Sequence, residues 1–440
     1  MSKLIAAFWE ASLAGIDVPR RDRTSCKYEA YLPDTLAGRT FSFEGAVAAD
    51  VADAERAIIG LNAQATTLVD AEALARLLLR AESVASSRIE GLAIGPRRLL
   101  HADAERQFGG ASTDAGASEV LANIDAMAFA AEAVRDGEPV TLEIVLEAHR
   151  RLLAPTILSK HGGTIRQEQN WIGGNRYNPC SADFVPPPPG EVSRLLNDLI
   201  DFCNEDSMPA VAQAAIAHAQ FETIHPFVDG NGRVGRALIQ MVLRRRRLAS
   251  HVLPPVSLVL ATWADRYVDG LGATRYHGKP SSAAAQEGIN HWVGLFATAC
   301  RRAVEDANEF EKRIQQIQHE WRARVGTLRS GSATALLIDK LPGAPIITVQ
   351  SAAALIGRSV QAGNEAVSRL VEAGVLVQTK SGRRNRAFEA RDVIDAFTDL
   401  ERRLASPTGD TRVSPPVRPV PYRRPKAARK RPTGRGGASL

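Results

Sequence analysis

The sequence contains few cysteines, and their positions argue against a disulfide framework or a zinc knuckle. The 440 residues include four cysteines, and no two of them form a closely spaced pair. They are Cys26, Cys180, Cys203 and Cys300. Scattered cysteines of this kind are typical of a reducing compartment, so we expect a cytoplasmic protein.

Long apolar runs are also absent. No stretch approaches the roughly 20 consecutive apolar residues that cross a bilayer as a helix, so the sequence predicts no membrane span. Residues 1–21 contain an apolar patch that Glu10 interrupts, and no cleavage pattern follows it. A secretory signal peptide is therefore not expected.

Acidic residues are missing from the end of the chain. Residues 411–440 contain nine basic residues and no acid. Their charge of +9 exceeds the net charge of +6 for the whole chain. The rest of the chain is therefore slightly acidic. Because residues 403–440 are rich in Pro, Gly and Arg, we expect a disordered basic tail there. Such a tail could bind nucleic acid, an anionic membrane or an acidic partner through unspecific charge.

The most informative stretch that is present runs from His225 to Arg236 and reads HPFVDGNGRVGR. Apolar segments with helical spacing precede and follow it, which predicts a helix, a tight loop and a second helix. Gly230 and Gly232 allow backbone amides to approach a ligand closely. At the start of a helix, free N–H groups and the helix dipole bind phosphate, so this loop is predicted to bind an anion.

Four side chains in this stretch supply chemistry. Arg233 adds a charge-assisted bond to phosphate, and Arg236 lies on the same helix face one turn later. Asp229 is a hard oxygen ligand suited to Mg²⁺ that bridges phosphates. His225 is the only group of the stretch that accepts a proton near neutral pH. Together they predict nucleotidyl or phosphoryl transfer to a hydroxyl.

Two other interpretations of this region are weaker. The glycines between residues 230 and 235 fit the dinucleotide fingerprint, but the preceding segment is helical and no acid lies around residues 250–258. His218, Glu222 and His225 share one helical face and could ligate zinc. No further soft ligand is nearby, so we favour an orienting role for His218 and Glu222.

The stretch resembles the signature of the Fic family, H-P-F-x-[DE]-G-N-G-R-x-x-R, at every fixed position. The resemblance implies transfer of AMP from ATP to a Ser, Thr or Tyr hydroxyl of a protein, or of the enzyme itself. It implies that His225 is the general base and that Asp229 holds Mg²⁺. The implied phosphate-binding set, with Arg233 at the β-phosphate and Arg236 at the γ-phosphate, is Gly230, Asn231, Gly232, Arg233 and Arg236.

A second motif ends a predicted helix at Gly91. Ser86 and Glu90 are four residues apart and share a face; alone, this string would indicate a solvated helix end. Beside the signature, it resembles the inhibitory motif [ST]-x-x-x-E-[GN] of some Fic proteins. The resemblance implies that Glu90 pairs with Arg236, which removes the cation needed by the γ-phosphate, and repels the triphosphate.

Helical spacing dominates the chain, and the predicted fold class is mainly α. We expect an N-terminal region with the inhibitory helix at residues 1–115, and a Fic-type helical bundle as catalytic core at residues 116–325. Separate helices are expected at residues 281–298 and 302–322. The non-helical stretch 162–190 suggests a β-hairpin.

The resemblance implies that this hairpin is a flap, which lies over the active site and binds the target segment by strand addition. An ordinary surface hairpin is the alternative. Ile172 and Phe184 are the residues expected to contact the target or to shape the flap.

Residues 330–402 are expected to form a separate domain. Two capped helices, followed by a strand, a turn at residues 381–383 and a return strand, resemble a winged helix-turn-helix. Its expected recognition helix, residues 359–373, carries one arginine and two acids, which is weak for phosphate contact. DNA binding and protein interaction both remain open for this domain.

The leading hypothesis is a protein adenylyltransferase that uses ATP and Mg²⁺ and is inhibited by its own Glu90. One alternative is a DNA-binding regulator with the transferase core as a sensor. Another is a Fic enzyme that removes AMP or performs a different phosphotransfer, with Glu90 positioning water. The partners compatible with the sequence are the target protein, DNA or protein at the winged helix, and further copies of the chain.

Overall fold

A computed structural model of the chain describes residues 1–405 apart from 12–18, 20–21, 66–70, 108–113 and 380–385. The expected turn at residues 381–383 lies outside the described residues. So does the expected basic tail, except for residues 403–405, which end helix α15 (Arg391–Ala405).

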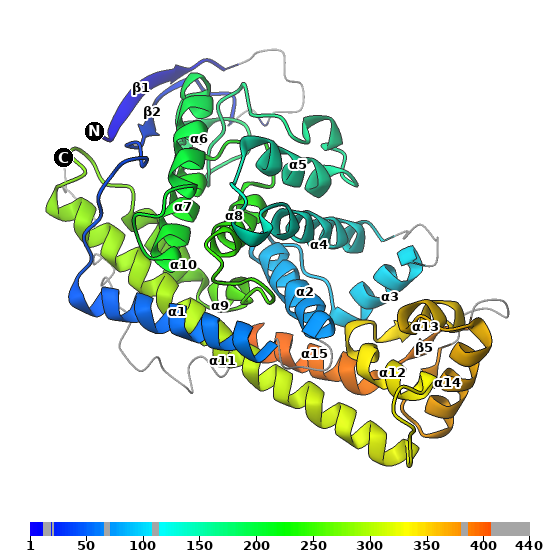
Figure 1. Ribbon diagram of the computed structural model, residues 1–440. Coiled ribbons are helices and arrows are strands. Elements are labelled where there is room, and N and C mark those ends of the chain that lie inside the picture. The colour runs from blue at the N-terminus through cyan, green and yellow to red at the C-terminus, as the bar shows by residue number, and fades with distance from the viewer. Residues whose placement is uncertain (12–18, 20–21, 66–70, 108–113, 380–385, 406–440) are drawn as a thin grey trace, which may run out of the picture.

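The described chain is mainly helical, which confirms the predicted fold class (Figure 1). The helices before the C-terminal part are α1 (Gly45–Ala65), α2 (Ala71–Ile89), α3 (Pro96–Gln107), α4 (Ala115–Ala133), α5 (Leu142–Leu153), α6 (Pro189–Cys203), α7 (Ala210–Ile224), α8 (Asn231–Arg245), α9 (Val256–Thr262), α10 (Ala264–Ala273) and α11 (Ala283–Val325). None of the helices in the described ranges is both long and apolar enough to cross a membrane.

Helix α7 is the centre of the core, because every one of its residues is buried. Its alanine-rich sequence lets neighbouring helices approach closely, and the indole nitrogen of Trp292 on α11 donates to the Ala215 carbonyl at 2.6 Å. Helix α8 follows the loop after α7 and is buried from Asn231 to Leu243. The loop between these two helices is therefore supported by buried structure on both sides.

Helix α11 is one continuous helix, so the expectation of two helices at residues 281–298 and 302–322 is wrong. Residues 299–301 contain no Gly or Pro. The buried face also continues through them, with Cys300 before the join and Ala303 after it. The helix ends only at Gly326, which has the positive φ of 78° that favours glycine.

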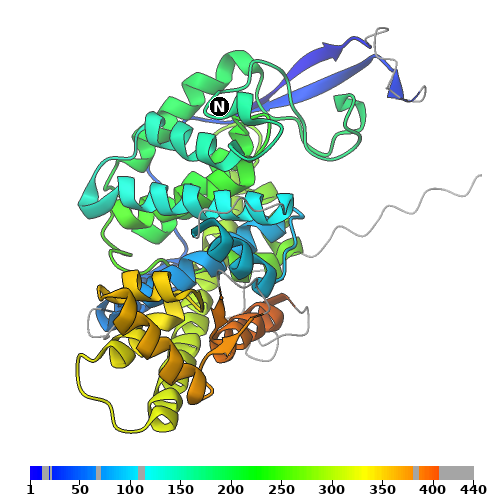
Figure 2. The ribbon, with the colours of Figure 1, turned by 90° about the vertical axis from the view of Figure 1, so that its right-hand side faces the viewer.

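The N-terminal hairpin consists of β1 (Lys3–Trp9) and β2 (Cys26–Leu32), which pair antiparallel. It extends from one end of the molecule (Figure 2). A disulfide joins Cys26 of β2 to Cys180, with the two Cα atoms 5.7 Å apart. The expectation of scattered, unpaired cysteines is wrong here, because the two residues are 154 positions apart and only the fold brings them together. The cysteine pattern therefore no longer argues for a reducing compartment.

The C-terminal part contains helices α12 (Ala333–Lys340), α13 (Val349–Ile356) and α14 (Val360–Glu372), and a small sheet. Its strands are β3 (Ile346–Ile347), β4 (Val377–Gln378) and β5 (Phe388–Glu389), in the order β3-β5-β4 with both pairs antiparallel. Helix α14 begins and ends within one residue of the expected recognition helix at residues 359–373.

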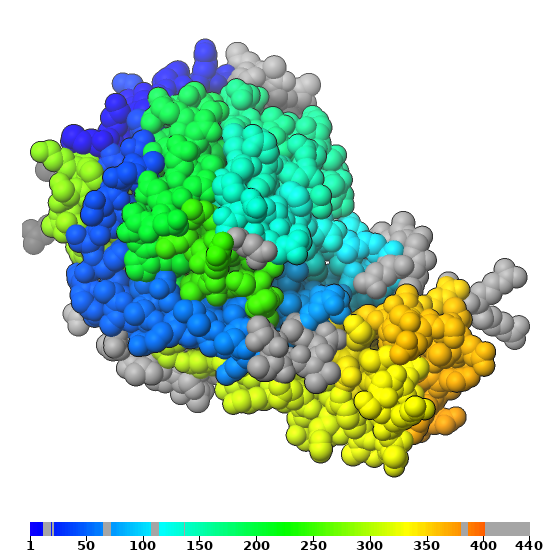
Figure 3. All heavy atoms as spheres, viewed as in Figure 1, coloured from blue at the N-terminus to red at the C-terminus, as the bar shows by residue number. Residues whose placement is uncertain are grey.

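The C-terminal part lies beside α2 and α3 (Figure 3), where the turn Leu341–Gly343 contacts α2, and β3 and α15 contact α3. The buried carboxylate of Glu389 accepts from Arg97 at 2.6 Å, and the Nε2 atom of His101 lies 2.6 Å from its other oxygen. Arg80 of α2 donates to the Gly343 carbonyl at 2.8 Å. The C-terminal part is thus bonded directly to the helices that flank the motif ending at Gly91.

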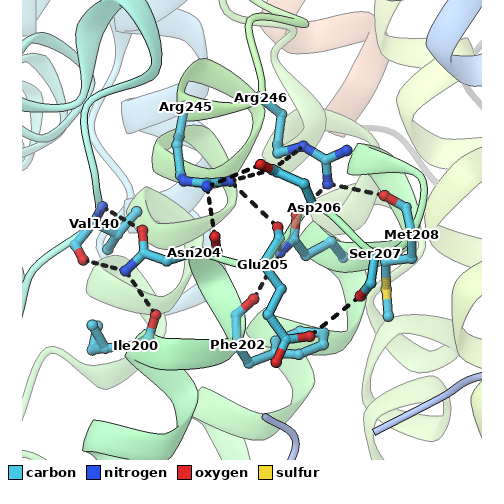
Figure 4. Close-up of polar contacts among 11 residues, drawn as sticks. Val140, Ile200, Phe202, Asn204, Glu205, Asp206, Ser207, Met208, Arg245 and Arg246 are labelled. Atoms are coloured by element: carbon cyan, nitrogen blue, oxygen red, sulfur yellow. Dashed lines mark hydrogen bonds and ion pairs between the residues drawn. The ribbon is translucent and has the colours of Figure 1, made fainter. Parts of the chain in front are cut away.

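The sequence alone predicts a solvated helix end for the run Arg244–Arg247 at the end of α8, where cations are favourable. The structure instead uses two of these arginines to hold the loop after α6 (Figure 4). Arg245 donates to the Asn204 carbonyl at 2.6 Å and pairs with Asp206 at 2.8 Å. Arg246 donates to the Met208 carbonyl at 2.9 Å. These two guanidinium groups stabilise the fold.

Helix α2 is anchored by a buried carboxylate that sequence reasoning did not single out. Glu82 accepts from the backbone N–H of Ser257 at 2.7 Å and from its hydroxyl at 2.5 Å. Gln240 of α8 donates to it at 3.4 Å. Glu82 therefore connects α2 to α8 and α9 two turns before Glu90.

Burial raises the pKa of the carboxyl groups of Glu82, Glu222 and Asp306 to about 7. In the unfolded chain such groups titrate at roughly pH 4. Between these values the folded state binds more protons, so the free energy of unfolding falls as the pH rises. We expect Glu82→Gln, which cannot ionise, to make this decline shallower by up to about 1.4 kcal/mol per pH unit.

Urea unfolding at several pH values between roughly pH 5 and pH 8 measures this slope. Glu105→Gln, at an exposed position of α3, is the matched control and should leave the slope unchanged. A slope that is the same in the wild type and in Glu82→Gln would contradict the prediction.

Candidate active site

The loop between α7 and α8 has an unusual backbone conformation. His225 ends α7 with a φ of 50° and a ψ of 61°, a left-handed conformation that is rare for a residue other than glycine. Gly230 starts α8 with a φ of 80°. The side chain of Asn231 closes the loop, because it accepts from the Phe227 N–H at 2.8 Å and donates to the Phe227 carbonyl at 2.9 Å.

Two residues of the stretch 162–190 hold this loop in place. Arg166 is buried and donates from Nε to the His225 carbonyl at 2.8 Å. Asn170 donates to the carbonyls of His225 and Phe227 at 3.2 and 3.1 Å. Sequence reasoning missed both residues, because they bind backbone carbonyls and no spacing marks such a contact.

His149 of α5 is a third support that was missed. Its Nδ1 atom accepts from the Gly163 N–H at 3.1 Å, so its Nε2 atom carries the proton and donates to the Asp229 carbonyl at 3.0 Å. Its ring stacks on Phe227 at a centroid distance of 3.7 Å. Burial lowers its pKa to about 4, which keeps the ring neutral at pH 7.

Ser86, Glu90 and Arg236 come together, although 146 positions separate Glu90 from Arg236. Arg236 is 1% exposed and donates to Glu90 at 2.7 Å. It also donates to the hydroxyl and the carbonyl of Ser86, each at 2.8 Å. Burial alone would raise the pKa of Glu90, but the charge and hydrogen bond of Arg236 outweigh it and lower that pKa.

The Glu90 carboxylate lies directly on the first turn of α8. A Cβ atom added to Gly232 would stand 1.9 Å from its Oε1 atom. The carboxylate therefore occupies the space beside the helix N-terminus in which an anion would bind.

Arg233 is buried, and two of its three side-chain nitrogens have no hydrogen-bond partner among the described residues. The third lies 3.3 Å from the Asp229 carboxylate. Unpaired buried guanidinium groups are costly, so these donors fit an anionic ligand such as phosphate.

The Nδ1 atom of the His225 imidazole is buried and has no hydrogen-bond partner in the described part of the chain. Burial, with the positive charge of Arg166, lowers the pKa of His225 to about 4. The ring is therefore neutral at pH 7 and able to accept a proton.

Asp229 is half-exposed and offers one carboxylate beside this arrangement. The described residues contain no cluster of three side chains that could hold a metal by themselves. The zinc interpretation thus has no support, and His218 donates to or accepts from the Tyr267 hydroxyl at 2.8 Å. A single carboxylate still fits Mg²⁺, which commonly combines one or two carboxylates with substrate phosphates.

The expected hairpin is present in a minimal form. Ile172 and Phe184 make one isolated antiparallel bridge, with N–H to carbonyl distances of 2.8 and 3.1 Å. The Tyr31 N–H of β2 donates to the Val185 carbonyl at 2.9 Å, so β2 lies beside the flap. We call residues 170–186 the flap below.

Two family models match the chain. The Fic/DOC family model matches residues 139–243, which contain the loop from His225 to Arg236. The Fic/DOC family N-terminal model matches residues 48–132, which contain Glu90.

Individual proteins also resemble part of the chain. Protein adenylyltransferase fic-1 of Caenorhabditis briggsae is 29% identical over 201 residues, which are 43% of this chain and 37% of that protein. Protein adenylyltransferase Fic of Drosophila willistoni is 35% identical over 118 residues, which are 26% of this chain and 22% of that protein. The matches thus span well under half the length of these curated relatives.

Among solved structures, a Fic family protein from Desulfovibrio desulfuricans G20 aligns over 80% of this chain and 97% of that chain, with a TM-score of 0.47 and 21% identity. The two matched segments, which carry the phosphate-type loop, both arginines and the glutamate, are thus similar to the Fic/DOC family and to its N-terminal part.

Proposed function

We propose that this protein is an adenylyltransferase, which transfers AMP from ATP to a hydroxyl of a protein and is inhibited by Glu90. The observation that carries the proposal is the state of the two arginines. Arg233 has buried donors without a partner, and Arg236 is held by a carboxylate that stands where a phosphate would bind. The similarity of both segments to the Fic/DOC family supports the same activity.

In this proposal, the side chains bind the triphosphate and position one proton acceptor. The amides of Gly230 to Gly232 and the guanidinium of Arg233 bind phosphate oxygens, and Arg236 binds the γ-phosphate once Glu90 has left. Asp229 is the residue that would hold Mg²⁺, which neutralises charge on the leaving diphosphate when it is bound.

His225 completes the reaction. Its neutral imidazole takes the proton of the acceptor hydroxyl while the oxygen attacks the α-phosphorus and the bond to the diphosphate breaks. General-base catalysis of this kind contributes roughly 10²- to 10⁴-fold. Arg166 and Asn170 act as positioning residues, because they fix the His225 carbonyl and thereby the ring.

The domain boundaries at residues 1–115, 116–325, 330–402 and 403–440 remain part of the proposal. The two capped helices and the β3-β5-β4 sheet support a winged-helix type of domain at residues 330–402. Arg369 of α14 donates to the carbonyls of Val325 and Thr327. Its guanidinium is thus engaged within the protein and does not support a DNA-binding role. We therefore place the adenylyltransferase ahead of the regulator.

Mass spectrometry of the Glu90→Gly protein after incubation with ATP and Mg²⁺ tests the activity. We expect the intact mass to increase by one or more adenylyl groups, and the labelled peptide to identify the acceptor residue. Label from the α-phosphate of ATP should be transferred, while label from the γ-phosphate should not. Transfer of the γ-label alone would favour phosphotransfer, and no transfer of either label would overturn the proposal.

A further inference from the structure

A cavity of about 320 Å³ lies between β2, the flap and the segment that joins α10 to α11. Residues of the N-terminal hairpin form one of its walls. The polar and aromatic side chains that line it include Lys27, Tyr28, Glu29, Phe184, Arg275 and His277. The disulfide between Cys26 and Cys180 and the bond from Tyr31 to Val185 hold this wall against the flap.

Arg275 is the cation of this cavity that is withdrawn from water. Its guanidinium lies over the Phe184 ring, 3.6 Å from the centroid, and its Nε atom is 3.5 Å from the Thr223 hydroxyl. No ion pair joins it to a carboxylate within the described ranges. Burial lowers its pKa to about 10, and Glu222, whose negative charge opposes this shift, is itself a buried carboxyl with a pKa raised to about 7.

The other charged groups at this cavity are exposed. Lys27, Glu29 and Asp183 all lie on the surface at its mouth, where water and salt weaken their effect on a bound ligand. A desolvated arginine without a carboxylate partner binds an anion more strongly than exposed charges do.

The cavity also lies close to the reacting position. Thr223, which Arg275 contacts, is two residues before His225 in the chain, and the charge of Arg275 contributes to the lowered pKa of His225. An acceptor hydroxyl must reach His225 for transfer. Since an extended chain advances about 3.3 Å per residue, a side chain near the acceptor would reach Arg275.

We propose that this cavity is a recognition subsite for an acidic side chain of the protein being modified, and that Arg275 binds its carboxylate. The inference rests on the proposed adenylyltransferase function, and it adds a preference for acceptors with an Asp or Glu nearby. Arg275 would then determine specificity without contacting ATP.

Peptides test this preference. Each peptide carries one Thr or Tyr, with Asp, Asn, Lys or phosphoserine placed in turn at the three positions on either side. The full-length Glu90→Gly protein is incubated with them and with ATP labelled at the α-phosphate. At one or more positions we expect the Asp peptide to be labelled about tenfold faster than its Asn counterpart, as for a charge-assisted hydrogen bond. If the phosphoserine peptide is labelled faster than the Asp peptide, the subsite binds phosphorylated targets. That result would overturn the proposal that Arg275 binds a carboxylate.

Charge reversal provides the sharper measurement. In the Glu90→Gly background, Arg275→Glu should abolish the preference for Asp and favour the Lys peptide at the same position. Arg266→Glu changes the charge equally at an exposed position of α10 that does not line the cavity, and should keep the preference for Asp. The same ranking of peptides for Arg275→Glu and its parent would overturn the subsite.

The failure of the proposed function would be recognised separately. If Glu90→Gly transfers no adenylyl group to any acceptor, including itself, the function is wrong and the subsite falls with it. If Glu90→Gly modifies itself but no added peptide, the self-modified sites of Glu90→Gly are compared with those of Arg275→Glu in the same background. An unchanged set of self-modified sites in Arg275→Glu would then overturn the subsite alone.

Discussion

Glu90→Gly should raise the rate of adenylyl transfer by roughly 10- to 150-fold over the wild type. The variant removes the 2.7 Å bond to Arg236 and clears the space beside Gly232. A charge-assisted hydrogen bond contributes about 1.5–3 kcal/mol. If breaking this bond is a cost of binding ATP in the reactive position, that free energy corresponds to the stated range of rates. The initial rate with ATP labelled at the α-phosphate measures the effect.

Glu90→Gln is the matched control, because it keeps the size of the side chain and an oxygen that accepts from Arg236. We expect a rate between those of the wild type and Glu90→Gly. The Glu90 side chain is 36% exposed and follows the end of α2, so neither variant should lower the melting temperature much. Equal labelling by the wild type and Glu90→Gly would remove Glu90 from the inhibitory role.

The proposed inhibitory contact is one part of a polar stripe that runs along α2 and one residue past its end. Glu82, Ser86 and Glu90 are spaced by four residues and therefore share one helix face. Glu82 binds Ser257 and Gln240, while Ser86 and Glu90 both bind Arg236. Since Glu82 is fully buried, α2 is fixed two turns before the residue that must leave. Release of Glu90 is therefore expected to involve the end of α2 rather than the whole helix.

The pairing of Glu90 with Arg236, which are 146 positions apart, was implied by the resemblance to the Fic family, and the structure contains it. Local patterns in the sequence were sufficient for the loop from His225 to Arg236 and for the helix that ends near Gly91. The reason is physical: phosphate-type loops need their donors within a few residues, so the sequence shows them together.

Contacts between distant residues were the ones that sequence reasoning missed. The strand β1 pairs with β2 across a segment with no turn signal that we recognised. Cys26 meets Cys180 because β2 contacts the short turn Pro179–Ser181, far away in the sequence. Arg166 binds backbone carbonyls, which every residue presents, so no residue type marks its partner. Glu82 was the one missed residue that the sequence does mark. It is an acid on a helix face that otherwise carries the apolar residues Leu78, Ala81 and Ala85, which indicates a buried carboxylate.

The predicted separate C-terminal domain illustrates the same limit of local patterns. Its helices and strands were recognisable from caps and alternation. Its attachment through Glu389 to Arg97 and His101 was not recognisable, because these partners are far apart in the sequence. Arg97 and Glu389 are separated by 292 positions. Because β5 has only two residues, no alternation of apolar and polar residues predicts that the Glu389 carboxylate is buried. Its burial follows from the packing of α3 on the sheet.

His225→Ala, made in the Glu90→Gly background, should lower the rate of transfer by roughly 10²- to 10⁴-fold. The imidazole has a pKa of about 4, so at pH 7 it is the neutral proton acceptor that the reaction needs, and alanine leaves only water in that role. ATP affinity should change little, because the phosphate contacts come from Arg233, Arg236 and the loop amides. Single-turnover rates and calorimetric ATP binding separate the two effects.

His319→Ala, at an exposed position of α11, is the control and should leave both quantities unchanged. A His225→Ala protein that binds ATP and still transfers AMP at the parent rate would show that another group takes the proton. The left-handed backbone at His225, which Arg166 and Asn170 maintain, would then serve only to shape the loop. Loss of ATP binding together with transfer would instead show that the imidazole supports the phosphate site.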